Sequence, residues 1–392
     1  PTQALMLRYA LTNSRNVNDA SHTDDLTDAS ARGSAFVADN SLNGTLTSTI
    51  REPLLNQLSF ELAQRRAVDR TQSTSVPGVL IPGLALFGTP LSGNDRRFET
   101  HLEFADTLSL DRHAHLFKLG ARADRIALRT SVPDGSQGFF VFASLAALQV
   151  GTPDLFTQSF GNQSGNFNTD LTEVRIAGFA QDHWTLSRSL TLDYGVRYDF
   201  NHLPAPLPQD AANISPRAGF AWAPAKSLVV RGGFGIFYDR FQLSTLTRLL
   251  QQDGTHGFSL VPDDANAAAI YQFAPIAALA PSIWRAQPGL RTPYSEVASL
   301  GVEQALPLQT TLSAEFQSVH GVRFGRSSNI NLAPPVVVTA ANAASLGVAL
   351  PTPQQLGRPA FAPTRLNPAY DAINQFASEA GSNYNGGTIT LN

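Results

Sequence analysis

Residues 190–200 read LTLDYGVRYDF, and their side chains fall into two separate sets. Leucine, tyrosine, valine and phenylalanine occupy the even positions from Leu190 to Phe200, whereas threonine, aspartate, glycine and arginine occupy the odd ones. Successive side chains of a β-strand point to opposite faces of a sheet, while a helix would mix the two sets. The stretch therefore predicts a strand with one apolar and one polar face.

The same alternation recurs along the chain and predicts about twelve strands. They are expected near residues 3–12, 37–49, 55–68, 96–108, 114–128, 172–185, 189–201, 215–223, 227–240, 294–305, 309–320 and 383–392. Short connections, near residues 50–54, 110–114, 186–189, 224–226 and 306–308, alternate with long ones at 13–36, 69–95, 129–171, 202–214, 241–293 and 321–382.

This alternation of short and long connections is typical of outer-membrane barrels, which have short periplasmic turns and long extracellular loops. It predicts an all-β fold, an antiparallel up-and-down transmembrane β-barrel that is incomplete at about twelve strands. Hydrophobic residues make up 43% of the chain and charged residues 15%, which suits strands that turn one face to lipid. No apolar run is long enough for a transmembrane helix, and a net charge of -3 gives no electrostatic case for nucleic acid.

Charged residues on the polar faces are expected to point into the lumen, because an arginine facing lipid near the midplane costs about 2–4 kcal/mol. In one interpretation they hold a plug or line a substrate path, and in the other they form cross-strand ion pairs that stabilise the wall. The candidates are Arg122, Arg175, Asp193, Arg197, Asp199, Arg217, Arg231, Asp239 and Glu315.

Aromatic residues lie near both ends of the predicted strands. Trp184 and Trp222 precede short turns, whereas Tyr198, Phe200 and Tyr238 lie near long loops. Two aromatic bands at the two water interfaces are expected of a barrel. The alternative is that these rings belong to the core of a soluble sandwich.

No motif for catalysis, cofactor or metal is found. The chain has no cysteine, no phosphate-binding G-x-x-x-x-G-K motif, no H-E-x-x-H and no G-x-S-x-G elbow. His113 and His115 form an H-x-H pair that is expected in a solvated turn, and Asp263 and Asp264 are expected to be exposed in a loop. The sequence therefore predicts no enzyme, no cofactor and no metal site.

Three stretches resemble a known family. IAGFAQDHWTLSRSLTLDYGVRYDF (176–200) resembles the signature hairpin of TonB-dependent outer-membrane receptors. SPRAGFAWAPAKSLVVRGGFGIFYDRF (215–241) is similar to the following hairpin of the Oar-like branch. TPYSEVASLGVEQALPLQTTLSAEFQSVHG (292–321), with NIN at 329–331, resembles a later strand pair of that branch.

The resemblance implies a longer parent protein in the outer membrane of a Gram-negative cell. Family members have a signal peptide, often an N-terminal β-sandwich domain, a plug, a TonB partner complex and a 22-stranded barrel with a plugged lumen. We expect residues 1–392 to be a partial barrel domain without the plug, signal peptide or N-terminal domain. Outer-membrane lipid is the expected surrounding, and an unknown nutrient the expected ligand.

Three functions remain open at this point. The first is a share in the import of a scarce nutrient, such as a siderophore, cobalamin, an oligosaccharide or a peptide. The second is surface adhesion or binding through the long loops without transport. The third is a soluble all-β protein. The predicted wall itself is expected to be either open or forced into a smaller closed barrel.

Overall fold

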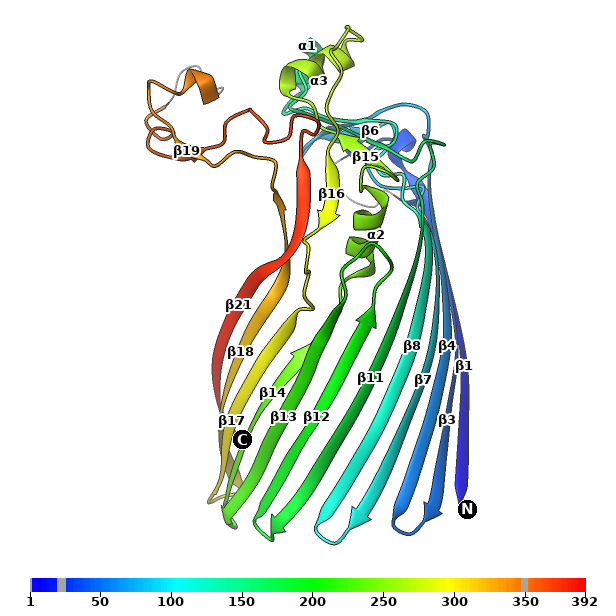
Figure 1. The fold of residues 1–392 in the computed structure, drawn as a ribbon, viewed down its shortest axis with the longest axis vertical. Helices are drawn as coiled ribbons and strands as arrows, with labels where there is room; N and C mark the ends of the chain where they lie inside the picture. Colours follow the sequence, from blue (N-terminus) through cyan, green and yellow to red (C-terminus); the bar gives the residue numbers. More distant parts are fainter. Residues whose placement is uncertain (1, 20–25, 347–351) are drawn as a thin grey trace.

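A computed structural model describes residues 2–19, 26–346 and 352–392. Twelve long strands in the described part form one curved antiparallel sheet, in which neighbours in the chain are neighbours in space (Figure 1). They are β1 (Gln3–Asp19), β3 (Gly33–Arg51), β4 (Leu54–Thr71), β7 (Arg96–Arg112), β8 (His115–Ser131), β11 (Asn168–Ser187), β12 (Leu190–His202), β13 (Asp210–Ala225), β14 (Leu228–Tyr238), β17 (Tyr294–Leu306), β18 (Thr310–Asn329) and β21 (Ile373–Leu391). The predicted fold class and up-and-down order are confirmed.

The sheet is an open wall rather than a closed barrel. β1 begins the strand order, and β21 lies near its other end, followed by the short parallel strand β16 (Ile283–Ala286). Within the described residues, no hydrogen-bond ladder joins β1 to β21. Of the two expected outcomes, the incomplete curved wall is the one observed.

Several strands are longer than predicted. β1 continues past residue 12 to Asp19, and β18 continues past residue 320 to Asn329. The wall strands have 11 to 20 residues, whereas about 10 suffice to cross a bilayer at a tilt. The extensions escaped prediction because residues 13–16, Asn-Ser-Arg-Asn, are polar on both faces, while their backbones still pair with β3.

All five short turns lie at one end of the wall, the lower end in Figure 1. Each joins two adjacent antiparallel strands through two or three residues; Glu52 and Pro53, for example, join β3 to β4. His113, in the turn between β7 and β8, has a φ of 60°, in the left-handed region that tight turns use. The predicted separation of short turns from long connections is confirmed.

The long connections contain short strands and helices that the sequence analysis did not predict. Those at the other end of the wall form a cap with a second sheet, ordered β15 (Phe258–Leu260), β10 (Leu155–Phe160), β9 (Phe139–Val141), β5 (Gly78–Ile81), β6 (Ala85–Phe87) and β2 (Leu26–Thr27). The other cap elements are the helices η1 (Ala29–Ala31), α1 (Leu145–Val150), α2 (Leu243–Gln251) and α3 (Asp264–Tyr271). Strands of two to six residues are too short to show an alternation in sequence.

Two apolar clusters hold the cap together and fix it to the wall. Phe140, Phe142 and Phe156 form the centre of the first, and Tyr271 of α3 meets Phe142 edge-on at 5.0 Å. The second lies between α2 and the wall and contains Leu128, Leu171, Leu203, Leu207, Phe241, Leu246, Leu249 and Leu290. Burial of this second cluster positions α2 and the segment before it against the upper wall.

A separate arm leaves the top of the wall between β18 and β21 (Figure 1). It carries the small hairpin of β19 (Val336–Val337) and β20 (Pro359–Ala360) and the short helix η2 (Ala344–Leu346). None of the helices in the described residues is both long and apolar enough to span a bilayer.

Candidate functional site: the charged concave face of the wall

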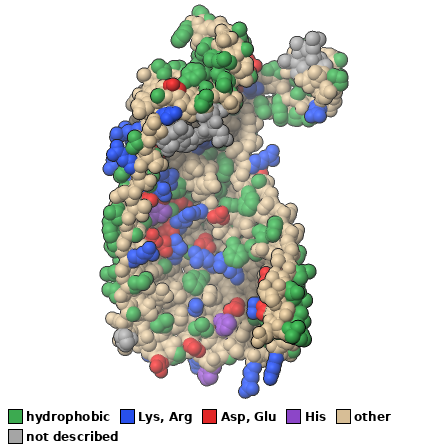
Figure 2. Space-filling model, turned by 180° about the vertical axis from the view of Figure 1, so that it is seen from behind, with side chains coloured by type: hydrophobic (Ala, Val, Ile, Leu, Met, Phe, Trp, Pro, Cys, Tyr) green, Lys and Arg blue, Asp and Glu red, His purple; other side chains and the backbone are tan. Residues whose placement is uncertain are grey.

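The strand register divides the wall into two chemically different faces. Arg122, Ala177 and Asp199 lie directly opposite one another on β8, β11 and β12, so their side chains share one face. Tyr194 and Val196 lie on the other face and are exposed. Figure 2 looks into the hollow of the wall, where arginine and acidic side chains gather. The charged face is therefore concave, and the apolar face is convex.

An ion-pair network occupies the upper half of the concave face. The Asp124 carboxylate accepts hydrogen bonds from Arg175 Nε at 2.8 Å and from Arg122 Nη2 at 3.4 Å. Arg122 Nη2 also donates to Glu103 at 2.6 Å, across the β7–β8 ladder. The Arg175 and Asp124 side chains are only 17% and 7% exposed. This pair is thus shielded from water, and its partners keep both charges compensated.

Arg197 and Asp199 continue the network on β12. Arg197 donates from Nε at 2.9 Å and 3.0 Å and from Nη2 at 2.8 Å to the Asp199 carboxylate. Together with Asp239 and the Arg122–Asp124–Arg175 group, they line a cavity of about 230 Å³. The wall therefore brings five of the nine predicted charges to one place: Arg122, Arg175, Arg197, Asp199 and Asp239.

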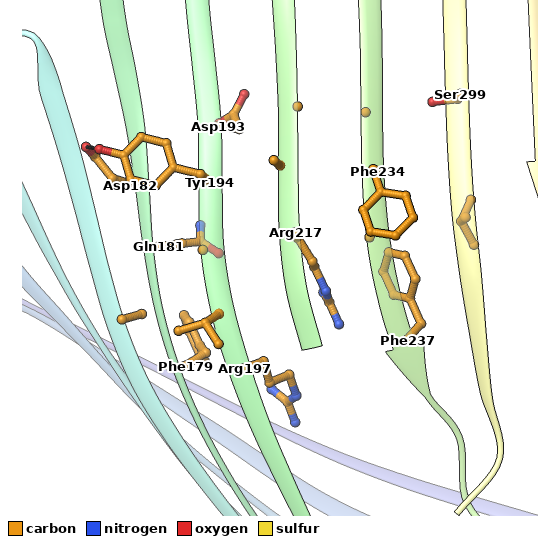
Figure 3. Close-up of a pocket in the computed structure, with 18 residues that line it drawn as sticks. Phe179, Gln181, Asp182, Asp193, Tyr194, Arg197, Arg217, Phe234, Phe237 and Ser299 are labelled. Carbon is orange, nitrogen blue, oxygen red and sulfur yellow. Dashed lines mark hydrogen bonds between the residues drawn. The ribbon is translucent and has the colours of Figure 1, made fainter. Parts of the chain in front are cut away.

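Arg217 lies lower on the wall, in a cavity of about 540 Å³ (Figure 3). Its guanidinium carbon lies 4.3 Å from the centre of the Phe237 ring, which is a cation–π arrangement. Gly235 makes this possible, because a Cβ there would lie 2.8 Å from the Phe237 ring and 3.2 Å from Arg217 Cγ. The glycine at position 235 therefore makes room for a side-chain stack on the concave face.

The three remaining predicted charges also lie on the concave face. Asp193 accepts a hydrogen bond from His183 Nδ1 at 2.7 Å. Arg231 lies 3.8 Å from Glu303, and it lines a cavity of about 410 Å³ that Glu315 also lines. Four of the nine charges, Arg122, Arg175, Asp193 and Arg231, pair across strands, and Arg197 and Asp199 pair within β12. A role toward a plug or a substrate stays a prediction.

The five predicted interface aromatics lie on the convex face of the strand register. Trp184 and Trp222 are near the short-turn ends of β11 and β13, and Trp222 is exposed. Tyr198 and Phe200 lie toward the cap end of β12, and the Tyr238 hydroxyl donates to the Ala212 carbonyl at 3.3 Å. Their role as a membrane girdle stays a prediction.

A buried carboxylate lies on the convex face of the wall. Asp182 lies opposite Tyr194 on the convex face, yet it is only 5% exposed. Its Oδ2 accepts hydrogen bonds from the Tyr194 hydroxyl and from His115 Nδ1, both at 2.7 Å. His115 in turn stacks on Trp184, with ring centres 5.3 Å apart. The expected solvated H-x-H turn is therefore half right, because His113 is exposed and His115 is packed.

The sequence analysis identified nine charges of the wall but did not identify three buried carboxylates. Asp124, Asp182 and Glu173 are all buried, and none was singled out. Asp182 could have been found, because it shares a strand face with Trp184 and Ile176. Asp263 is exposed as expected, and its carboxylate caps α3 by accepting from the Asn266 amide at 2.9 Å. No cluster of three or more metal-ligating side chains occurs within the described ranges.

Known structures share this architecture. One is the outer membrane transporter YddB from Escherichia coli, with a TM-score of 0.57 and 12% identity over 99% of this chain and 42% of that chain. Another is the ferripyoverdine receptor of Pseudomonas aeruginosa bound to ferripyoverdine, with a TM-score of 0.52 and 9% identity over 100% of this chain and 45% of that one. At such identities the likeness shows the fold alone, and the chain spans less than half of either structure.

Sequence comparison supports the same assignment. No curated protein matches the chain. The family described as "Outer membrane beta barrel domain" matches residues 1–207 and 202–392, which together cover the whole sequence. The protein is thus placed in the outer membrane, and the alternative of a soluble all-β protein is set aside. The chain belongs to the outer membrane beta barrel domain family.

Proposed function

We propose that this chain forms part of the barrel wall of a TonB-dependent receptor that imports a scarce nutrient across the outer membrane. The observation that carries the proposal is the open wall with its concave face lined by arginines and carboxylates. A wall that only anchored a surface domain would need no charged lining, whereas a lumen that conducts or binds a polar nutrient does. The likeness to an outer membrane transporter and to a ferripyoverdine receptor supports the same function.

The unpaired edges of the wall support a larger assembly. β1 and the lower part of β21 have no strand partner on their outer sides in the described structure. Open backbone edges are unstable in a bilayer, because hydrocarbon offers no hydrogen-bond partners. We propose that further strands of a longer polypeptide complete the barrel, and that a plug and the TonB complex serve it. The Oar-like branch stays a prediction from the quoted motifs, and no enzymatic role is proposed.

An uptake experiment tests the transport proposal. Cells lacking the full-length gene are compared with their parent for accumulation of radiolabelled ferric siderophores, cobalamin, oligosaccharides and dipeptides. We expect the deletion to abolish accumulation of one class, and a protonophore to abolish the same accumulation in the parent. Accumulation of every class at the parental rate in the deletion strain would contradict nutrient import.

Surface binding without transport is the second candidate, and the arm between β18 and β21 favours it. Among the described residues of that arm, five large apolar side chains are exposed: Val336, Val337, Leu356, Phe361 and Leu366. Exposed apolar groups gathered on one surface element are typical of contact sites. Replacing Phe361 and Leu366 by serine separates the two functions, because adhesion to a surface would fall while nutrient accumulation would stay at the parental rate.

A further inference from the structure

A cavity of about 400 Å³ lies on the concave face where the segment of residues 239–244, between β14 and α2, packs against the upper wall. β7 contributes His101, β8 contributes Ile126 and β11 contributes Glu173, while the crossing segment contributes Arg240 and Phe241. Phe241 belongs to the apolar cluster under α2, so the segment is held in place beside the wall. The cavity is of the size usual for small-molecule sites.

Glu173 is the unusual group in this cavity. Its side chain is 0% exposed, and neither carboxylate oxygen has a hydrogen-bond partner among the described residues. A buried carboxylate without a partner costs several kcal/mol, so such a group ordinarily has one. Glu173 also lies one residue before the ladder between β11 and β12 begins, at Val174. It therefore has no residue of β12 opposite it.

The nearby cations of the wall are already paired with other carboxylates. Arg97 and His101 both bond to Glu99, and Arg175 bonds to Asp124. Within the described lining, Asp239 accepts the Arg240 backbone amide, and Glu173 is the carboxylate that has no hydrogen bond. A cationic group from elsewhere would therefore find a partner there without breaking an existing ion pair.

Arg240 supplies the complementary group. Its side chain is exposed and lines the cavity, and in the described structure its guanidinium has no ion pair. Only its backbone amide is bonded, to Asp239 Oδ1 at 2.8 Å. The cavity thus holds the Glu173 carboxylate and the Arg240 guanidinium, neither of which has a hydrogen-bonded partner for its charged group among the described residues. Its other charged lining groups are Asp239 and the bonded pair of Arg97 and Glu99, and its apolar side chains are Ile126, Phe241 and Leu243.

We propose that this cavity binds a small zwitterion, an amino acid or short peptide, whose ammonium group pairs with Glu173 and whose carboxylate pairs with Arg240. Guanidinium and carboxylate match as a two-point hydrogen-bonded pair, and the apolar side chains accommodate an aliphatic side chain. A ligand with a single charge would leave one of the two protein groups unpaired, and an uncharged sugar would leave both. The inference refines the proposed import function by naming the substrate class.

Binding of the dipeptide glycyl-leucine to outer membranes that contain the full-length protein tests this site. Membranes from the deletion strain give the background, and two blocked probes are compared with the free dipeptide. N-acetyl-glycyl-leucine lacks the ammonium group, and glycyl-leucinamide lacks the carboxylate. We expect each blocked probe to bind at least about tenfold more weakly, because each leaves a charged protein group unpaired.

Two variants assign the contacts. Glu173→Gln should bind the free and acetylated dipeptides equally, and Arg240→Gln should bind the free and amidated dipeptides equally. Arg129→Gln is the matched control, since Arg129 pairs with Asp170 outside the cavity and is 77% exposed. It should keep the full discrimination. Heat-modifiable gel mobility shows that each variant is folded.

Two results would overturn the inference: no specific binding of glycyl-leucine, or equal binding of the free and acetylated dipeptides to the wild type. Membrane binding needs no energy source, so this test is separate from the uptake test. If the protein accumulates another nutrient but does not bind the dipeptide, only the proposed zwitterion site is contradicted. If the protein binds the three probes with the expected differences but accumulates no nutrient, only the transport proposal is contradicted.

Discussion

The two faces of the wall use the same strands but hold charge in opposite ways. On the concave face charges are numerous and pair across strands, as Arg175 does with Asp124. On the convex face, the exposed side chains in the middle of β12 are Tyr194, Val196 and Tyr198. The buried Asp182 lies on that face with two hydrogen-bond donors. The two faces therefore compensate their charges differently: by ion pairs across strands on the concave face, and by two hydrogen-bond donors around the buried Asp182 on the convex face.

The largest effect is expected from moving a charge to the wrong face. Val196 lies in the middle of β12 on the convex face, so Val196→Arg should destabilise the protein in lipid by about 2–4 kcal/mol. Urea unfolding in lipid vesicles measures this. Ser299→Arg is the control on the concave face, where the new side chain lies in a cavity that Glu315 also lines, and it should cost under about 1 kcal/mol. Equal costs for the two variants would refute the assignment of the faces.

The next effect is expected from breaking the shielded pair of the concave face. Arg175→Gln removes the closest donor to Asp124, and Arg122 remains as a second donor at 3.4 Å. We expect a loss of about 2 kcal/mol in the same unfolding assay, less than a fully buried pair would lose. The exposed pair of Arg129 and Asp170 gives the contrast, and Arg129→Gln should change stability by under about 0.5 kcal/mol. Comparable losses would show that burial does not distinguish the two pairs.

The buried Asp182 on the convex face gives the next prediction, again on the stability of the folded protein. His115→Phe keeps a ring beside Trp184 but removes one of the two donors to Asp182, which should cost about 1–2 kcal/mol. Adding Asp182→Leu removes the carboxylate as well, and the double variant should regain most of that loss. A double variant less stable than His115→Phe alone would mean that the carboxylate stabilises this face by some other contact.

The last prediction concerns a carboxylate on neither face of the wall. Asp95 lies in the loop before β7, and burial, with the nearby charges of Asp134 and Asp69, raises the pKa of its carboxyl to about 7. The folded protein then binds a proton more tightly than the unfolded chain, whose pKa is 3.8. Stability should therefore fall as pH rises from about 4 to about 7 and stay level above that.

Asp95→Asn tests this dependence, because asparagine cannot titrate. The variant should lose the decline between those pH values and should be more stable than the wild type at pH 8. The measurement is the unfolding midpoint in urea across the pH range. A variant with the same pH profile as the wild type would show that another group causes the decline.

The wall could be predicted from sequence because its strands have a lipid face, and lipid forces a strict alternation. Residues 190–200 show this alternation fully, and β12 spans Leu190–His202. The cap could not be predicted, since β9 is Phe139–Val141 and packs on both sides, which leaves no alternation to detect. The same alternation placed the nine candidate charges on the polar face of their strands. Glu173 could not be found this way, because its burial depends on residues 239–244, far away in the sequence.

The orientation of the wall is the central claim, and a lipid-quenching measurement tests it most directly. The chain has no cysteine, so Val196→Cys and Arg197→Cys each give one labelling site, on adjacent residues of opposite faces. With a fluorophore on each, nitroxide-labelled phospholipids should quench the label at residue 196 strongly and the label at residue 197 little. Equal quenching of the two labels, or stronger quenching at residue 197, would contradict a convex face in contact with lipid.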